Sequence, residues 1–144
     1  VRVAGMDNVL VRLSRCCSPV PGDAIVGFIT RGRGVSIHRT DCPNVAREDP
    51  ARLVPAEWAP DPEATFPVEI EVLAMDRQGL LNDVLQAVNE TKTNLTEVTG
   101  RADRNRLARI TMTLAIRNLD HLQRVVERIK RVQDVHSVRR VLEP

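Results

Sequence analysis

Residues 68–88 have the sequence VEIEVLAMDRQGLLNDVLQAV, in which two periodicities follow one another. Apolar residues and glutamates alternate from Val68 to Val72, a pattern typical of a strand with one buried face. From Leu80 to Val88 the apolar residues return at helical spacing. The stretch therefore predicts a strand followed by an amphipathic helix that packs against it.

Downstream of this strand and helix, two further segments have strand character, and a second helical pattern and a last strand follow them. The second of these strands alternates strictly, and a polar loop separates the pair. We predict strands at 93–99 and 107–116, a hairpin loop at 100–105, a helix at 122–132 and a last strand at 135–142. The order β-α-β-β-α-β is that of a ferredoxin-like unit, one antiparallel sheet covered by two helices.

Upstream of this unit, two short β-type runs at 24–30 and 34–38 flank Arg31-Gly32-Arg33, whose glycine permits a tight reversal. A hairpin is predicted there. Asp41-Cys42-Pro43 then predicts a helix start, with Asp41 as N-cap and proline in the first turn. The first module is thus expected to be a small β-hairpin plus a helix.

Five prolines between residues 50 and 67 indicate a linker, although Trp58 is expected to pack onto a neighbouring module. The predicted class is α+β. We expect a cysteine-bearing module at 1–58, a proline-rich linker at 59–65 and the βαββαβ domain at 66–144.

All three cysteines lie close to a histidine, in the segment from Cys16-Cys17 to His38 and Cys42. Thiolate and imidazole are preferred ligands of Zn²⁺, and four of them complete a tetrahedral site. Adjacent residues on an extended strand point to opposite faces, so Cys16 and Cys17 could both ligate only at a bend. The alternatives are cysteines that pack in the core beside a hydrogen-bonded His38, or a redox pair. A helix start at Cys42 would lower the pKa of its thiol.

The 144-residue chain has a formal charge of +2, and lysine occurs only at positions 92 and 130. Arginines gather around the cysteine segment, where they could bind RNA phosphates or simply form a solvated face. The candidates are Arg12, Arg15, Arg31, Arg33 and Arg39. With no apolar run near the roughly 20 residues of a membrane span and no secretory signal, we expect a cytoplasmic protein. The start at Val1 suggests a piece of a longer chain.

The segments RCCSPVPGD (15–23) and IVGFITRGRGVSIHRTDC (25–42) closely resemble the conserved-cysteine module of the long RelA/SpoT homologues, the stringent-response enzymes. DRQGLL (76–81) resembles the start of the ACT domain that ends those proteins. The resemblance implies the regulatory end of an enzyme that makes and degrades guanosine tetraphosphate and pentaphosphate. No catalysis is expected in this piece.

The resemblance also implies partners. In this family the cysteine module, also called a zinc finger, contacts ribosomal RNA while the whole protein senses uncharged tRNA on the ribosome. The expected role is therefore to transmit amino-acid starvation to the N-terminal catalytic domains, with zinc as the candidate cofactor on Cys16, Cys17, His38 and Cys42.

ACT domains of this family imply a second hypothesis, an amino-acid sensor and homodimer with the cysteine module as a structural brace. Some members bind branched-chain amino acids near the loop after the first strand. The corresponding positions here are Asp76, Gly79, Leu80, Leu81 and Asn94. His121 and His136 have no thiol neighbours and are expected to be surface or sheet residues without a role.

Overall fold

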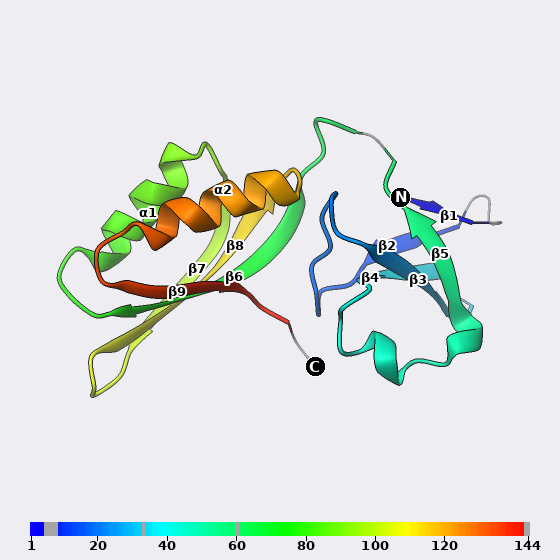
Figure 1. Cartoon of the computed structure of the whole chain (residues 1–144), viewed down its shortest axis with the longest axis horizontal. Coiled ribbons are helices and arrows are strands. Elements are labelled where there is room, and N and C mark those ends of the chain that lie inside the picture. The colour runs from blue at the N-terminus through cyan, green and yellow to red at the C-terminus, as the bar shows by residue number, and fades with distance from the viewer. Residues whose placement is uncertain (5–8, 33, 60, 143–144) are drawn as a thin grey trace. The chain divides into compact units, whose positions relative to one another are not determined.

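The computed structural model describes residues 1–4, 9–32, 34–59 and 61–142, and Figure 1 shows the path of the chain. Its contacts divide it into two compact units, Val1–Ala64 and Thr65–Val141, with Leu142 assigned to the first. Within the described ranges, no helix is both long enough and apolar enough to cross a membrane.

The first unit is built on a five-stranded sheet with the order β1-β5-β3-β4-β2. The expected hairpin is confirmed, and three further strands join it. The strands are β1 (Arg2–Val3), β2 (Val11–Leu13), β3 (Ile25–Thr30), β4 (Gly34–Arg39) and β5 (Leu53–Glu57). β2 pairs with β4 in parallel, whereas the other pairs are antiparallel.

Alternation along β4 separates the core of this unit from its candidate site. Val35 and Ile37 are buried and form a core cluster with Val3. Successive side chains of a strand point to opposite faces, so Ser36 and His38 lie on the other face. The sheet therefore has one apolar face that stabilises it and one face that carries the histidine.

The prediction of a helix that begins at Asp41 is wrong. The Asp41 carboxylate is taken by the guanidinium of Arg39 instead of capping a helix, and the Cys42 N–H donates to the Arg39 carbonyl at 3.0 Å. The chain closes a tight turn there and forms only a 3₁₀ turn at Val45–Arg47, with a second one at Pro50–Arg52.

The first part of the proline-rich stretch is also not a linker, because it contains β5. Pro55 has no N–H to donate, but its carbonyl accepts the Ala4 N–H at 3.0 Å. Trp58 is half-buried, and its indole N–H donates to the Asp23 carbonyl at 3.0 Å. The packing expected for this tryptophan is therefore present within the first unit.

The second unit has the ferredoxin-like order predicted from its periodicities, which confirms the α+β class. Its four strands form a sheet of order β7-β8-β6-β9, with both helices on one face (Figure 1). The elements are β6 (Phe66–Met75), α1 (Leu80–Glu90), β7 (Leu95–Ala102), β8 (Leu107–Ile116), α2 (Leu119–Lys130) and β9 (Val135–Arg140).

Alternating residues of β6 and β8 supply the core beneath the helices, and Ile70, Met112 and Leu114 are fully buried. On the open face of β6, Glu71 is only 7% exposed. Arg109 and Arg139, on the strands at either side, each donate to its carboxylate at 2.8 Å. These two guanidiniums hold the pKa of Glu71 below its usual value although burial opposes the shift.

His121 is not the surface or sheet residue that was expected. It lies on α2 and is 2% exposed. Its Nδ1 accepts the Arg117 N–H at 3.0 Å, and its Nε2 lies 2.8 Å from the Thr93 hydroxyl. Burial lowers its pKa, so the ring is a neutral structural link between the start of α2 and the segment before β7.

Candidate metal centre

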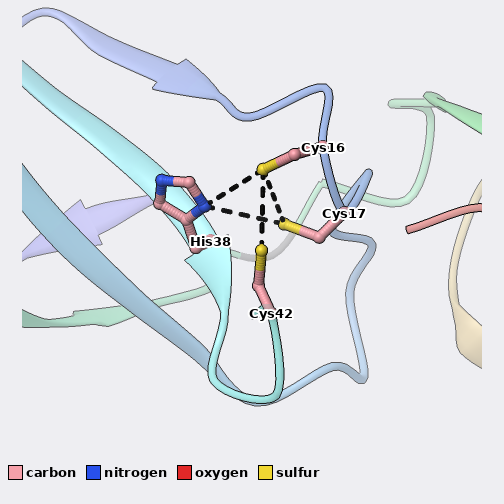
Figure 2. Close-up of side chains that lie close together, drawn as sticks. All are labelled: Cys16, Cys17, His38 and Cys42. Carbon is pink, nitrogen blue, oxygen red and sulfur yellow. Dashed lines mark hydrogen bonds between the residues drawn. The ribbon is translucent and has the colours of Figure 1, made fainter. Parts of the chain in front are cut away.

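The three thiols and the His38 imidazole converge at one end of the first unit's sheet (Figure 2). Cys16 and Cys17 lie in the turn that follows β2. His38 is the penultimate residue of β4, and Cys42 follows in the turn after that strand. Two segments far apart in sequence thus contribute two side chains each.

Both vicinal cysteines reach the cluster because the chain bends at their position. Residues 15–17 form a turn, closed by the Ser18 N–H donating to the Ser14 carbonyl at 3.1 Å. This is the bend that the sequence required for joint ligation. All three cysteines are free thiols in the structure.

Four of the six distances between the ligand atoms are close to those of a tetrahedral zinc site. A Zn–S bond of about 2.3 Å places two sulfurs of a tetrahedral site about 3.8 Å apart, and a sulfur and a nitrogen about 3.6 Å apart. The Cys16 Sγ lies 4.0 Å from that of Cys17, 3.6 Å from that of Cys42 and 3.4 Å from the His38 Nδ1. The Cys17 Sγ lies 3.8 Å from the same nitrogen. All four ligand atoms fall within 4.8 Å of one another, so they could hold a metal ion.

Burial favours the protonated, neutral form of the thiols Cys17 and Cys42. Desolvation raises the pKa of Cys17 to about 12, although the Arg39 N–H donates to its sulfur at 3.3 Å, and the neighbouring thiols raise the pKa further. Desolvation also raises the pKa of Cys42, which corrects the lowered pKa expected from a helix start. It lowers the pKa of His38, so the imidazole is neutral. A divalent cation would supply the charge that stabilises buried thiolates and would reverse the shifts of the thiols.

The arginines predicted to bind RNA have different surroundings. Arg12 on β2, Arg15 in the cysteine turn and Arg31 at the hairpin tip are exposed. The Arg39 side chain is 14% exposed and is paired with Asp41. Arg33 lies outside the described residues.

Four of the five residues predicted to bind an amino acid lie together in the second unit. Asp76, Gly79, Leu80 and Leu81 line a cavity of about 500 Å³ between the start of α1 and the strands β7 and β8. Asn94 is not among the lining residues. Residues that sequence reasoning missed complete the wall, namely Arg77, Asn82, Gly100, Arg101, Ala102, Ala108 and Ile110.

Sequence reasoning also missed Ser14, whose hydroxyl lies 3.1 Å from the His38 Nε2. β2, which brings it there, has only three residues and pairs in parallel with a strand more than twenty positions away. A strand this short has no usable periodicity, so the sequence carries no signal of the contact.

Two family models match the chain. The RelA/SpoT RIS domain matches residues 1–59, and the ACT domain matches residues 62–140. The solution structure of the ACT domain from the GTP pyrophosphokinase of Chlorobium tepidum is similar in fold, with a TM-score of 0.50 at 20% identity. That similarity covers 56% of this chain and 90% of the solved one.

Curated relatives align along nearly all of this chain. A Streptomyces coelicolor protein named GTP pyrophosphokinase is 41% identical over 143 residues, which is 98% of this chain and 17% of the relative. The bifunctional (p)ppGpp synthase/hydrolase RelA of Mycobacterium tuberculosis is 43% identical, over 96% of this chain and 19% of the relative. The GTP pyrophosphokinase of Escherichia coli K12 is 42% identical, over 98% and 20%. The chain thus spans about a fifth of the length of these relatives.

Proposed function

The chain belongs to the RelA/SpoT family, with a RIS domain followed by an ACT domain, and from this we propose that it is a non-catalytic regulatory piece of a stringent-response enzyme. Its first unit would contact ribosomal RNA in the cytoplasm. Engagement of a ribosome that carries uncharged tRNA would be transmitted to the catalytic domains of a longer chain. Those domains would make and degrade (p)ppGpp.

The observation that carries this proposal is the Cys/His cluster with exposed arginines on the same unit. Four ligand atoms within 4.8 Å suit one Zn²⁺ and would fix the turn after β2 against the turn after β4. When bound, zinc would act as a structural cross-link. Arg12, Arg15 and Arg31 are exposed on the unit that this cross-link would hold together. Guanidinium groups form forked hydrogen bonds to phosphate oxygens, which is the chemistry that an RNA backbone requires.

Substitution Arg31→Glu at the hairpin tip is expected to weaken co-sedimentation with ribosomes and to flatten its salt dependence. Each lost phosphate contact lowers the slope of log affinity against log salt by about one. Arg47→Glu, at an exposed position on the 3₁₀ turn, changes the charge equally and serves as the control. An equal loss in both variants, or no loss in Arg31→Glu, would contradict the role given to the hairpin.

The cavity of the second unit favours a second candidate function, amino-acid sensing. Gly79 has a positive φ of 80° and precedes α1. The Leu80 N–H donates to the Arg77 carbonyl at 3.3 Å, so the following N–H groups, those of Leu81 and Asn82, would bind a carboxylate. Leu81, which is 44% exposed, and Ile110 add apolar lining suited to a branched side chain. β7 is an edge strand on which every residue after Leu95 is exposed, which suits pairing with a second copy.

Calorimetry with valine, leucine and isoleucine tests the sensor, and sedimentation tests the homodimer. Heat of binding that disappears in a Leu81→Glu variant would support the cavity as an amino-acid site. No heat at physiological concentration in the unsubstituted chain would exclude it.

A further inference from the structure

Ser14 lies on the opposite side of the His38 ring from the sulfurs. Its hydroxyl oxygen is 3.1 Å from Nε2, whereas Nδ1 faces the Sγ atoms of Cys16 and Cys17 at 3.4 and 3.8 Å. Figure 2 shows this nitrogen of His38 directed at the two thiols. We propose that Ser14 is the positioning residue that fixes the ring and the tautomer of His38 for metal ligation through Nδ1. This inference rests on the metal site of the proposed function.

The chemistry follows from the single N–H of a neutral imidazole. Ligation through Nδ1 requires a free lone pair on that atom, so the ring proton must be on Nε2. The Ser14 oxygen is within reach to accept this proton in a hydrogen bond. If the hydroxyl donated to Nε2 instead, the ring proton would be on Nδ1 and would point at the sulfurs. Accepting from Nε2–H therefore selects the tautomer that can bind the metal.

The backbone of Ser14 fixes the position of its hydroxyl. Its N–H donates to the Ile37 carbonyl at 2.9 Å, which extends the pairing of β2 with β4 up to the residue before His38. Its carbonyl accepts the Ser18 N–H and so closes the turn that carries both cysteines. An alanine at this position keeps both backbone bonds and removes only the hydroxyl.

Ser14→Ala is therefore expected to fold and to hold one zinc per chain, with affinity lowered by roughly 10–100-fold in competition with a chromophoric chelator. Ser14→Thr retains a hydroxyl and should restore most of the affinity. Ser36→Ala is the matched control, because Ser36 is a buried serine on the same strand and face as His38. It should bind zinc as the unsubstituted chain does.

A second readout does not depend on any variant. In the zinc-loaded chain, ¹H–¹⁵N correlation of the His38 ring should show the proton on Nε2, slowed in exchange with water by its bond to Ser14. A proton on Nδ1, or fast exchange at Nε2, would overturn the inference, as would unchanged zinc affinity in Ser14→Ala. Fast exchange or unchanged affinity would leave the metal site standing, whereas a proton on Nδ1 would remove that nitrogen as a ligand. Elemental analysis that finds no metal in the unsubstituted chain would remove the metal site and this inference together.

Discussion

Removing the metal with a chelator is expected to unfold the first unit at 25 °C and to leave the second unit folded. Structural zinc contributes an apparent free energy of about 10–16 kcal/mol in small zinc domains, which is comparable to the roughly 5–15 kcal/mol that stabilises a whole domain. The five-stranded sheet has a small core centred on Val3, Val35 and Ile37. A core of this size contributes little free energy of folding when the metal is removed.

Two spectroscopic signals of the same chain report the folding of the two units separately in this experiment. Trp58 is the only tryptophan and is held in the first unit by its bond to Asp23, so its fluorescence reports that unit. Both α-helices of the described residues belong to the second unit, so the helical circular dichroism reports the ACT domain. Chelation should change the fluorescence and spare the helical signal. An unchanged Trp58 unfolding transition would contradict a structural role for the metal.

The Cys42→Ser substitution removes one candidate ligand and is expected to weaken zinc binding. Losing one of four ligands should cost about a quarter of the binding free energy, about 3 kcal/mol or roughly two orders of magnitude in zinc affinity. A chelator should then act on this variant at a far lower concentration than on the unsubstituted chain. The same chelator response in both chains would show that Cys42 is not a ligand.

Among substitutions that add a single methyl group to the first unit, Gly34→Ala is expected to be the most destabilising. A Cβ at this glycine would lie 2.1 Å from the Leu10 carbonyl oxygen, which also accepts the Val35 N–H at 2.8 Å. The backbone of Leu10 would have to move, and the start of β2 would move with it. Overpacking and a lost hydrogen bond together should cost about 3 kcal/mol or more.

Gly32→Ala is the matched control for this collision. Gly32 has a positive φ of 72°, and Gly34 has one of 103°, so an alanine is strained at either position. A Cβ at Gly32 meets nothing within 4 Å. The two unfolding midpoints, followed by Trp58 fluorescence in the zinc-loaded chains, should differ by more than about 12 °C. Equal midpoints would show that the close approach of Leu10 and Gly34 has no energetic consequence.

The second unit could be predicted almost fully because its patterns are local and long. β8 alternates over ten residues, and the two helices repeat apolar residues at helical spacing, so each element reports its own buried face. Glu71 was the exception on its strand. Its burial comes from Arg109 and Arg139 on other strands, which no local pattern contains.

The first unit was less predictable because its short strands pair across long sequence distances. β5 was not predicted because it contains Pro55, and proline lacks the N–H that a regular strand donates. The sequence of Asp41, Cys42 and Pro43 satisfied the local rule for a helix start, but the bond from Cys42 to Arg39 closes a turn there. The four candidate ligands could be grouped from residue type and clustering alone, and the structure brings their side chains together. Their tetrahedral spacing depended on the turn at Cys16 and Cys17.

The zinc content of the chain tests the central claim most directly. The chain would be produced without added zinc, dialysed against metal-free buffer and measured by elemental analysis against its concentration. One zinc per chain, retained in the unsubstituted protein and largely lost from Cys42→Ser after the same dialysis, is the predicted result. A ratio well below one in the unsubstituted chain would contradict the account and would leave the three cysteines and His38 as packing residues.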